Sequence, residues 1–312
     1  MQLKQTTVLF IFLLFSSTVF SQEGKNDMLF EQAGYHFPYQ LTRPAKDWKL
    51  PKKLVEISGL SYIDKHRIAC VQDEKGSIYV FNVKKEEVET KIDFGNHGDY
   101  EGIEIVGKDA WVLKSNGTLY QVKDYLKDKN PVVKKYKTGL SAKNNAEGLA
   151  YDAIDRSLLI ACKGYPFVNE EDEKNAKSFK AIYRFDLKSG ELDTKPFLLI
   201  KLDSIKQYKH YNVMTLLGIE LLAFFDTSEG DVSFQPSAIA IQPFTGNLYI
   251  LASVGKSLAV FSKQGKMLSL VRLNSKIHAQ PEGICFSPDG TLYIANEGKD
   301  GKGIILKFEQ NR

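Results

Sequence analysis

Apolar and polar residues alternate in short stretches along most of this chain, and helical periodicity is nearly absent. Residues 287–308 show the pattern clearly, since they read SPDG, TLYIA, NEGKDGKG and IILKF in succession. Residues 242–251 repeat it as QPFTG and NLYIL. Short alternating runs separated by Gly, Asp and Asn are typical of β-strands joined by tight turns. The pattern therefore predicts an all-β protein.

One apolar run recurs five times with an acidic or small polar residue near its start. The copies are ISGLSY at 57–62, YEGIEI at 100–105, AEGLAY at 146–151, PSAIAI at 236–241 and PEGICF at 281–286. The equivalent polar residues lie 43, 46, 90 and 45 residues apart, and they are Ser58, Glu101, Glu147, Ser237 and Glu282. Four-stranded propeller blades occupy about 40 to 50 residues each. The repeat therefore predicts a five-bladed β-propeller.

The step of 90 residues leaves a six-bladed propeller open as an alternative. Residues 147–202 form one blade enlarged by the polar loop NEEDEKNAKS, whereas residues 203–232 lack the turn spacing and paired strand patterns of another blade. We therefore favour five blades. We interpret YNVMTLLGIELLAFF at 211–225 as a short helix or a loop that covers the side of the propeller.

The last repeat ends after its third strand, at Phe308, and leaves one blade incomplete. An unpaired edge strand invites aggregation, so another segment has to cover it. The segment FPYQLTRPAKDWKL at 37–50 precedes the first repeat in the position of a fourth strand. The sequence predicts that the N- and C-terminal strands close the ring, and that the propeller domain spans residues 37–312.

The N-terminus has the layout of a cleavable signal peptide. Lys4 is followed by the apolar run VLFIFLLF and then by small and polar residues up to Ser21. That layout predicts a signal peptide over residues 1–21, a linker over 22–36, and a periplasmic or secreted mature protein. No other segment approaches the roughly 20 apolar residues that a spanning helix requires, so we expect no transmembrane segment.

Composition narrows the possible partners. The chain has 312 residues with 42 basic and 38 acidic side chains, and its formal charge of +4 is too small and too dispersed to indicate nucleic-acid binding. Its three cysteines, Cys70, Cys162 and Cys285, lie in apolar runs. We interpret them as buried thiols rather than as a disulfide or a reactive centre. We expect a monomer.

The recurring acidic residues are the main candidate for chemistry. In a propeller, the start of each innermost strand and the end of the second strand meet at the same mouth of the central channel. The first position contributes Glu101, Glu147 and Glu282, besides two serines. The ends of the second strands are Asp73, Ser115, Lys163, Ser253 and Glu297. The alignment therefore predicts one ring that contains five carboxylates.

Carboxylates that converge on one axis repel unless they are protonated, spread apart or neutralised by a cation. A ring of oxygen atoms without histidine suits Ca²⁺, which accepts six to eight oxygen ligands in flexible geometry. We predict a calcium site formed by Glu101, Glu147 and Glu282, with Asp73 and Glu297 as supplementary acids. The alternative is a hydrated ring, in which Lys163 supplies part of a cation's charge.

The motifs DYEGIEI, NAEGLAY, QPSAIAI and QPEGICFSPDGTLYIANEG follow one another after an export signal. In this order they resemble the SdiA-regulated family of bacterial exported proteins, over roughly residues 40–310. The resemblance implies a five-bladed β-propeller that is distantly similar to NHL-repeat proteins. It also implies a calcium site in at least one member and no established biochemical activity.

Two classes of function remain open. The chain lacks the G-x-S-x-G, H-E-x-x-H and Walker motifs, its five histidines are scattered, and we expect His97 to lie in an exposed loop. The first class is a calcium-binding module for an unknown exported ligand or protein partner. The second is a calcium-dependent hydrolase of the phytase-like or lactonase-like kind, with its site at the channel mouth and an unknown set of catalytic residues. Propellers support both, and the fold does not decide between them.

Overall fold

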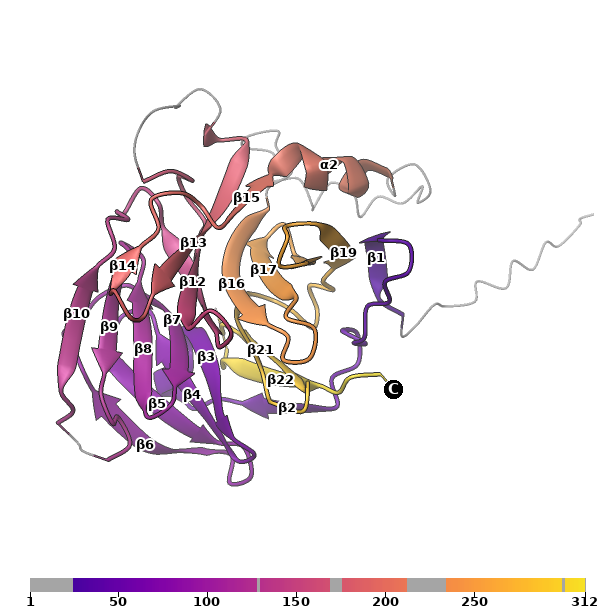
Figure 1. Ribbon diagram of the computed structural model, residues 1–312. Helices are drawn as coiled ribbons and strands as arrows, with labels where there is room; N and C mark the ends of the chain where they lie inside the picture. Colours follow the sequence, from indigo (N-terminus) through magenta and orange to yellow (C-terminus); the bar gives the residue numbers. More distant parts are fainter. Residues whose placement is uncertain (1–24, 128–129, 169–175, 212–233, 299–300, 312) are drawn as a thin grey trace, which may run out of the picture.

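The computed structural model describes residues 25–127, 130–168, 176–211, 234–298 and 301–311. These residues form five antiparallel sheets around a central axis (Figure 1). The innermost strands of the five sheets are β3, β7, β11, β16 and β20, and each packs against the innermost strands on both sides of it. The fold is therefore the predicted five-bladed β-propeller. The predicted signal peptide, residues 1–21, lies outside the described residues.

Blade 1 contains β3 (Ile57–Asp64), β4 (Arg67–Gln72), β5 (Ser77–Asn82) and β6 (Glu87–Asp93). Blade 2 contains β7 (Tyr100–Val106), β8 (Asp109–Lys114), β9 (Thr118–Val122) and β10 (Val133–Lys137). Blade 3 contains β11 (Ala146–Asp152), β12 (Ser157–Cys162), β13 (Phe179–Asp186), β14 (Glu191–Leu192) and β15 (Leu198–Lys201). The second strand of each blade is almost completely buried, in keeping with its near-continuous apolar sequence.

Blade 4 contains β16 (Gln235–Ile241), β17 (Leu248–Val254), β18 (Ser257–Phe261), β19 (Met267–Arg272) and β1 (Asp27–Glu31). Blade 5 contains β20 (Pro281–Phe286), β21 (Leu292–Asn296), β22 (Ile304–Phe308) and β2 (Lys46–Lys49). The remaining elements are the 3-10 helix η1 (Lys52–Leu54) and helix α2 (Leu202–Tyr211). Apart from Tyr211, the segment interpreted as a helix or loop cover, 211–225, lies outside the described residues.

The ring closes through its two termini, as predicted. Strand β2 pairs antiparallel with β22, with Trp48 opposite Ile305, and so completes blade 5. Trp48 is buried there and stacks on Tyr293. An isolated bridge between Tyr39 and Gln310 continues the contact between the termini. The edge of β22 is therefore covered by a strand that lies about 260 residues earlier in the chain.

The stretch 22–36, which the sequence predicts as a linker, contains one further strand. Strand β1 pairs with β19 as a fifth, outermost strand of blade 4, and its central Leu29 is 7% exposed. Figure 1 shows β1 beside β19, at the side of the molecule where the described chain begins. Five residues with one buried position give too weak an alternation to mark a strand without its partner.

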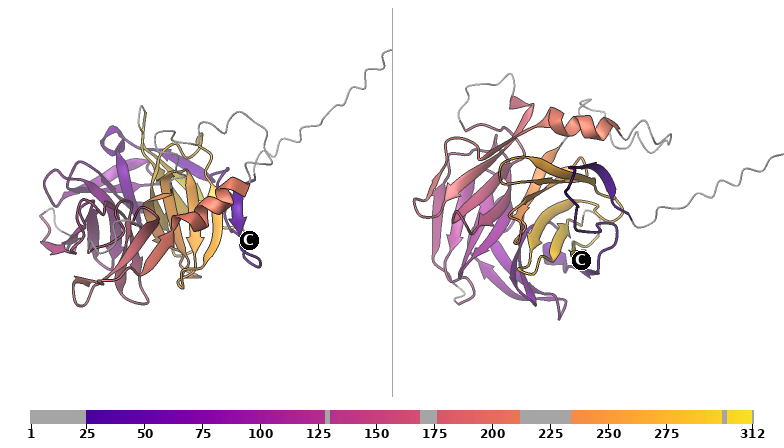
Figure 2. Two further views of the ribbon diagram at one scale, coloured as in Figure 1. Left: turned by 90° about the horizontal axis from the view of Figure 1, so that it is seen from above. Right: turned by 45° about the vertical axis from the view of Figure 1, so that its right-hand side comes forward.

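The core is divided into clusters that lie between neighbouring blades, as the repeat implies. Cys70, Cys162 and Cys285 belong to these clusters and are buried free thiols, as predicted. Helix α2 lies at the periphery, next to β15 (Figure 2). Among the described residues, no helix has the length and apolar character needed to cross a membrane.

Candidate functional site

A β-bulge places the recurring polar residue at the start of every innermost strand. In each blade the register shifts between the residues on either side of it, for example between Tyr100 and Gly102 or between Ala146 and Gly148. The residues left without a partner are Ser58, Glu101, Glu147, Ser237 and Glu282. A bulge locally re-aims the extra side chain. The recurring sequence motif therefore marks a β-bulge in every blade, and each bulge turns one side chain toward the channel.

The glycine that follows this residue lets the innermost strands approach one another closely. A Cβ atom on Gly59 would lie 3.0 Å from the Cα of Gly102, and one on Gly102 would lie 2.8 Å from the Cβ of Leu149. A side chain at either position would push neighbouring blades apart. The Glu-Gly pairs thus combine a carboxylate directed at the channel with a tight blade interface.

The channel mouth is a cavity of about 180 Å³ lined almost entirely by polar side chains. Its lining residues are Glu56, Ile57, Ser58, Asp73, Glu101, Glu147, Lys163, Gln280, Glu282 and Glu297. All five residues that the sequence predicts as metal ligands are among them, although they come from four different blades. Ser115 and Ser253, the other predicted ends of second strands, do not line the cavity.

An apolar ring closes the channel just below the mouth. It is formed by the residue that follows each glycine position, and its members are Leu60, Ile103, Leu149, Ile239 and Ile284. The space between these side chains is only about 10 Å³. That is about the room of a single water molecule, and its lining is apolar. The mouth is therefore a pouch with an apolar floor rather than one end of an open pore.

Glu147 already has a full set of partners. Its Oε1 lies 2.9 Å from the Nζ of Lys163 and accepts a hydrogen bond of 2.8 Å from the Nδ2 of Asn145. Its Oε2 accepts a second bond of 3.1 Å from the same Lys163 ammonium. Burial raises the pKa of Glu147 to about 7, although Lys163 acts in the opposite direction. This carboxylate is neutralised within blade 3.

Glu101 forms no salt bridge with any other described residue. Burial and the carboxylates of Glu147, Asp99 and Glu282 together raise its pKa to about 9. Burial also raises the pKa of Glu282, against the opposing effects of Lys163 and of hydrogen bonds with Ser253 and Gln280. Among the described residues that line the mouth, six carboxylates face the single ammonium group of Lys163, and Lys256 acts on Glu282 from outside the lining. The mouth is therefore rich in negative charge, and Glu101 shows the largest effect of it.

Two further oxygen atoms at the mouth lack partners. Oδ1 of Asp73 and Oε1 of Gln280 are buried and accept no hydrogen bond from the described residues. Burial and the nearby Glu56 raise the pKa of Asp73 to about 6. The amide nitrogen of Gln280 donates to Glu297, which orients the unpaired oxygen of the amide. Unpartnered buried oxygen atoms are unusual in folded proteins and call for an explanation such as an ion.

A second polar column, two residues before the bulge, was missed by the sequence reasoning. It consists of Glu56, Asp99, Asn145, Gln235 and Gln280. Asn145 and Gln280 each orient a carboxylate of the mouth, while Asp99 adds negative charge beside Glu101. A polar residue at the same position of every repeat is the signal that could have revealed this column.

The arrangement as it stands is not a formed metal centre. Among the described residues, no three Asp, Glu, His or Cys side chains are grouped closely enough to hold a metal ion. His97 lies exposed in the loop before β7 and does not line the cavity. The mouth offers carboxylate, amide and hydroxyl oxygens around a small space, which is the donor chemistry of a hard cation rather than of zinc. Their grouping around an ion remains a prediction.

The family comparison agrees with the order of the sequence motifs. The family model described as SdiA-regulated matches residues 38–299, which is most of the chain. The protein belongs to the SdiA-regulated family. The matched region covers all five Glu-Gly or Ser-containing repeats, so the mouth is built from family sequence. No curated protein matches the chain significantly.

One solved structure above a TM-score of 0.5 shares the fold, and two others are similar at lower scores. Glutaminyl cyclase of Myxococcus xanthus is similar with a TM-score of 0.53 and 11% identity, over 86% of this chain and 96% of that chain. A streptogramin B lyase is similar with a TM-score of 0.45 and 10% identity, over 85% and 97% of the two chains. The PQQ-bound aldose sugar dehydrogenase of Streptomyces coelicolor has a TM-score of 0.48 and 9% identity, over 86% and 98%. At 11% identity the likeness to the Myxococcus structure shows a shared fold alone.

Proposed function

We propose that this protein is an exported calcium-binding β-propeller whose channel mouth binds a ligand or a protein partner. The single observation that supports it most is Glu101, a partly buried carboxylate whose pKa is raised to about 9 by burial and by the charges of three other carboxylates. Such a group needs a proton or a cation. Ca²⁺ suits the oxygen atoms available, and it is abundant where a protein with a cleaved signal peptide resides.

The predicted ligands differ in the partners that they already have. We therefore expect them to contribute unequally to calcium binding. Glu101 and Glu282 lack a salt bridge among the described residues, and Asp73 has a buried oxygen atom with no hydrogen-bond partner. We assign these three the primary role, with the amide oxygen of Gln280 as a fourth donor. Glu147 joins only if Lys163 moves away, because both of its oxygen atoms are engaged. Binding of one ion by these donors requires their side chains to rotate toward one point of the cavity that they line.

Calcium titration of thermal stability tests the proposal. A ligand that binds only the folded state stabilises it by about RT ln(1 + [L]/Kd), or roughly 2.7 kcal/mol at a hundredfold excess over Kd. Exported calcium modules have Kd values of about 0.1 to 1 mM. In a domain of this size 10 mM CaCl₂ should raise the melting temperature by about 3 to 5 °C over ionic strength-matched NaCl.

Charge-neutral variants locate the ion. Glu101→Gln and Glu282→Gln should each remove at least half of the calcium-dependent shift, since the amide keeps the volume and loses the charge. Glu87→Gln, at an exposed position of the outer strand β6, is the matched control and should retain the full shift. The proposal is wrong if calcium stabilises no more than matched NaCl, or if both mouth variants retain the full effect.

A second function is favoured by one observation. Asp73 combines a pKa of about 6 with an unpartnered oxygen atom at the same cavity, which is the state of a carboxylate that could accept a proton from water near neutral pH. Beside a bound Ca²⁺ this geometry suits hydrolysis of a phosphoester or a lactone. Turnover of either substrate class that requires calcium and disappears in Asp73→Asn would favour the hydrolase over the binding module.

A further inference from the structure

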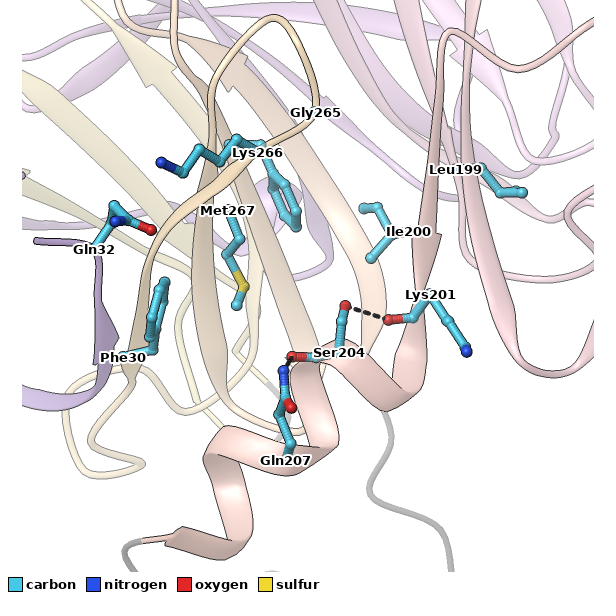
Figure 3. A pocket seen from close by; sticks show the side chains of 11 residues that line it. Phe30, Gln32, Leu199, Ile200, Lys201, Ser204, Gln207, Gly265, Lys266 and Met267 are labelled. Carbon is cyan, nitrogen blue, oxygen red and sulfur yellow. Dashed lines mark hydrogen bonds between the residues drawn. The ribbon is translucent and has the colours of Figure 1, made fainter.

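A second cavity, of about 360 Å³, lies at the periphery of the propeller and away from the channel. It is bounded by β1, β15, the hairpin of β18 and β19, and the first turns of α2 (Figure 3). Its volume falls within the range of small-molecule sites in proteins. Strand β1 and helix α2 stand outside the four-stranded repeat, so this cavity is built from additions to the propeller.

Apolar side chains from two neighbouring blades form the walls. They are Phe30, Leu199, Ile200, Phe261 and Met267. Phe261 and Ile200 are also part of the buried core, with exposed fractions of 4% and 2%. Leu199, in contrast, is 41% exposed, so the core cluster continues to the surface at this point. Methionine adapts its shape to irregular partners, which suits a wall of a binding site.

Among the described residues, the charged side chains of the lining are positive only. They are Lys201 and Lys266, and no Asp or Glu from the described part of the chain lines the cavity. Within the described part of the chain, no carboxylate lies within salt-bridge distance of either ammonium group. Figure 3 shows the Lys266 side chain extending toward Gln32 on one side of the cavity, whereas Lys201 extends from β15 away from Met267. The positive end of the cavity is therefore the end with Lys266 and Gln32.

The other polar residues of the lining are occupied with the start of helix α2. The Ser204 hydroxyl donates a 2.6 Å hydrogen bond to the carbonyl of Lys201. The Gln207 amide donates a 3.2 Å bond to the carbonyl of Ser204 (Figure 3). These bonds stabilise the first turns of the helix and leave recognition of a ligand's polar group to Lys266 and Gln32.

We infer that this cavity binds one molecule of an amphiphilic carboxylate. Its hydrocarbon part packs against Phe30, Phe261 and Met267, and its carboxylate accepts hydrogen bonds from Lys266 and Gln32. An apolar wall beside an unpaired ammonium group complements this class of molecule at both ends. A neutral amphiphile satisfies only the wall, and a small inorganic anion satisfies only the ammonium group. This inference is independent of the proposed calcium site.

Equilibrium dialysis with the mature chain and labelled decanoate, below its aggregation concentration, tests the inference against 1-decanol of equal chain length. One solvent-exposed ion pair contributes about 0.2 to 1 kcal/mol, so decanoate should bind about three times more tightly than the alcohol. Raising NaCl from 50 to 500 mM should abolish that preference, because salt screens exposed charges. Equal binding of the two probes, or no binding of decanoate, overturns the inference.

Variants locate the two halves of the ligand. Lys266→Gln should remove the preference for decanoate while binding of 1-decanol is unchanged, and Lys108→Gln, in the exposed turn between β7 and β8, is its matched control. Leu199→Glu places a like charge at an exposed wall position, where folding is not at risk, and should reduce decanoate binding at least tenfold. A melting curve confirms that each variant is folded. Unchanged decanoate binding in Leu199→Glu places the probe elsewhere and refutes the site.

A membrane surface is the competing source of carboxylate or phosphate amphiphiles. Sedimentation with vesicles of phosphatidylglycerol separates the two cases, since a pocket for one free molecule does not retain the protein on vesicles. Association with vesicles that Lys266→Gln abolishes, in the absence of decanoate binding, would identify a membrane contact and overturn the proposed ligand.

Discussion

The same bulge position carries serine in blades 1 and 4 and glutamate in blades 2, 3 and 5, and the two residue types do different work. The Ser58 hydroxyl donates a 2.6 Å hydrogen bond to the carbonyl of Tyr100 in the next blade. The Ser237 hydroxyl donates a 2.9 Å bond to the carbonyl of Pro281 in the next blade. The glutamate side chains are two bonds longer, and their carboxylates line the cavity, which Ser58 lines as well. The same β-bulge thus joins neighbouring blades where it carries serine and adds negative charge to the channel mouth where it carries glutamate.

The two serines hold the backbone directly before the two bulge glutamates that form no salt bridge with another described residue. Tyr100 and Pro281, whose carbonyls accept the serine bonds, are the residues directly before Glu101 and Glu282. Glu147, which follows no such residue, is fixed by Lys163 and Asn145. The comparison indicates that each of the three bulge glutamates is fixed either by its own salt bridge or through a hydrogen bond from the preceding blade to the residue before it.

Removal of the ammonium group should have the largest effect. Lys163→Met leaves Glu147 buried without a cation, and breaking one side of a buried ion pair costs about 3 kcal/mol. The free energy of unfolding in the presence of chelator should fall by that amount at pH 8. It should fall less at pH 5, because the pKa of Glu147 is raised to about 7 and the carboxyl group is then protonated.

Denaturant unfolding measures this loss, and Lys84→Met in the exposed turn after β5 is the control. Calcium should restore part of the lost stability, since the variant frees both oxygen atoms of Glu147 for an ion. A loss that is equal at pH 5 and pH 8 would mean that Lys163 contributes packing rather than charge.

Neutralising Glu101 should have the opposite sign. Its pKa in the folded state is about 9, above the ordinary value of 4.5, so the folded protein retains a proton that the unfolded chain releases. The stability linked to this group is fully present below pH 4.5 and is lost as the pH rises toward 9. In chelator at pH 9, Glu101→Gln should therefore be more stable than the unsubstituted protein by at least about 2 kcal/mol, within the upper bound of roughly 6 kcal/mol that a pKa rise from 4.5 to about 9 sets.

The pH dependence of that difference is the decisive measurement. Other acids with raised pKa values, including Glu104 at about 7, change the stability of both proteins equally. The gain from Glu101→Gln should shrink to near zero at pH 4.5, and calcium should abolish it by stabilising the ionised form in the unsubstituted protein. A variant less stable than its parent at pH 9 contradicts the assignment of excess charge to Glu101.

The serine positions should show a smaller effect without pH dependence. Ser58→Ala removes a buried hydrogen bond and leaves the Tyr100 carbonyl with one partner fewer, which costs about 1 kcal/mol. Because no ionisable group is lost, the change in the free energy of unfolding should be the same at pH 5 and pH 8. A pH-dependent loss in Ser58→Ala would show that the hydroxyl acts on the charge of the mouth.

The repeat made much of this predictable. The spacing of Ser58, Glu101, Glu147, Ser237 and Glu282 correctly indicates five blades, and the missing fourth strand after Phe308 correctly indicates closure by residues 37–50. The same alignment brings five distant acids to one cavity, because equivalent positions of a propeller share one ring. Period and register are properties of the backbone, so a repeated sequence reports them directly.

Three features of the structure could not be predicted from the repeat, because they depend on single side chains or on segments outside it. Strand β1 occurs once, has five residues, and is defined only by its pairing with β19. The pairing of Glu147 with Lys163 singles out one of three glutamates that look equivalent in the alignment. The peripheral cavity combines β1, β15 and α2, which no periodicity relates. Contacts between unlike elements leave no common spacing in the sequence.

The smallest effect is expected at Asp73, which belongs to the second strand of blade 1 rather than to the bulge position. Its pKa is raised from 3.8 to about 6, so its stability contribution is lost as the pH rises from about 4 through 6. The residue is partly exposed, and solvent screening reduces the cost of its charge. In chelator at pH 8, Asp73→Asn should gain at most about 0.5 kcal/mol, against at least about 2 for Glu101→Gln. Denaturant unfolding of both variants in one buffer series gives the ratio. A gain in Asp73→Asn that equals or exceeds the gain in Glu101→Gln would mean that the unfavourable charge of the mouth lies mainly on the acids of the second strands. The carboxylates of the bulge glutamates would then be hydrated.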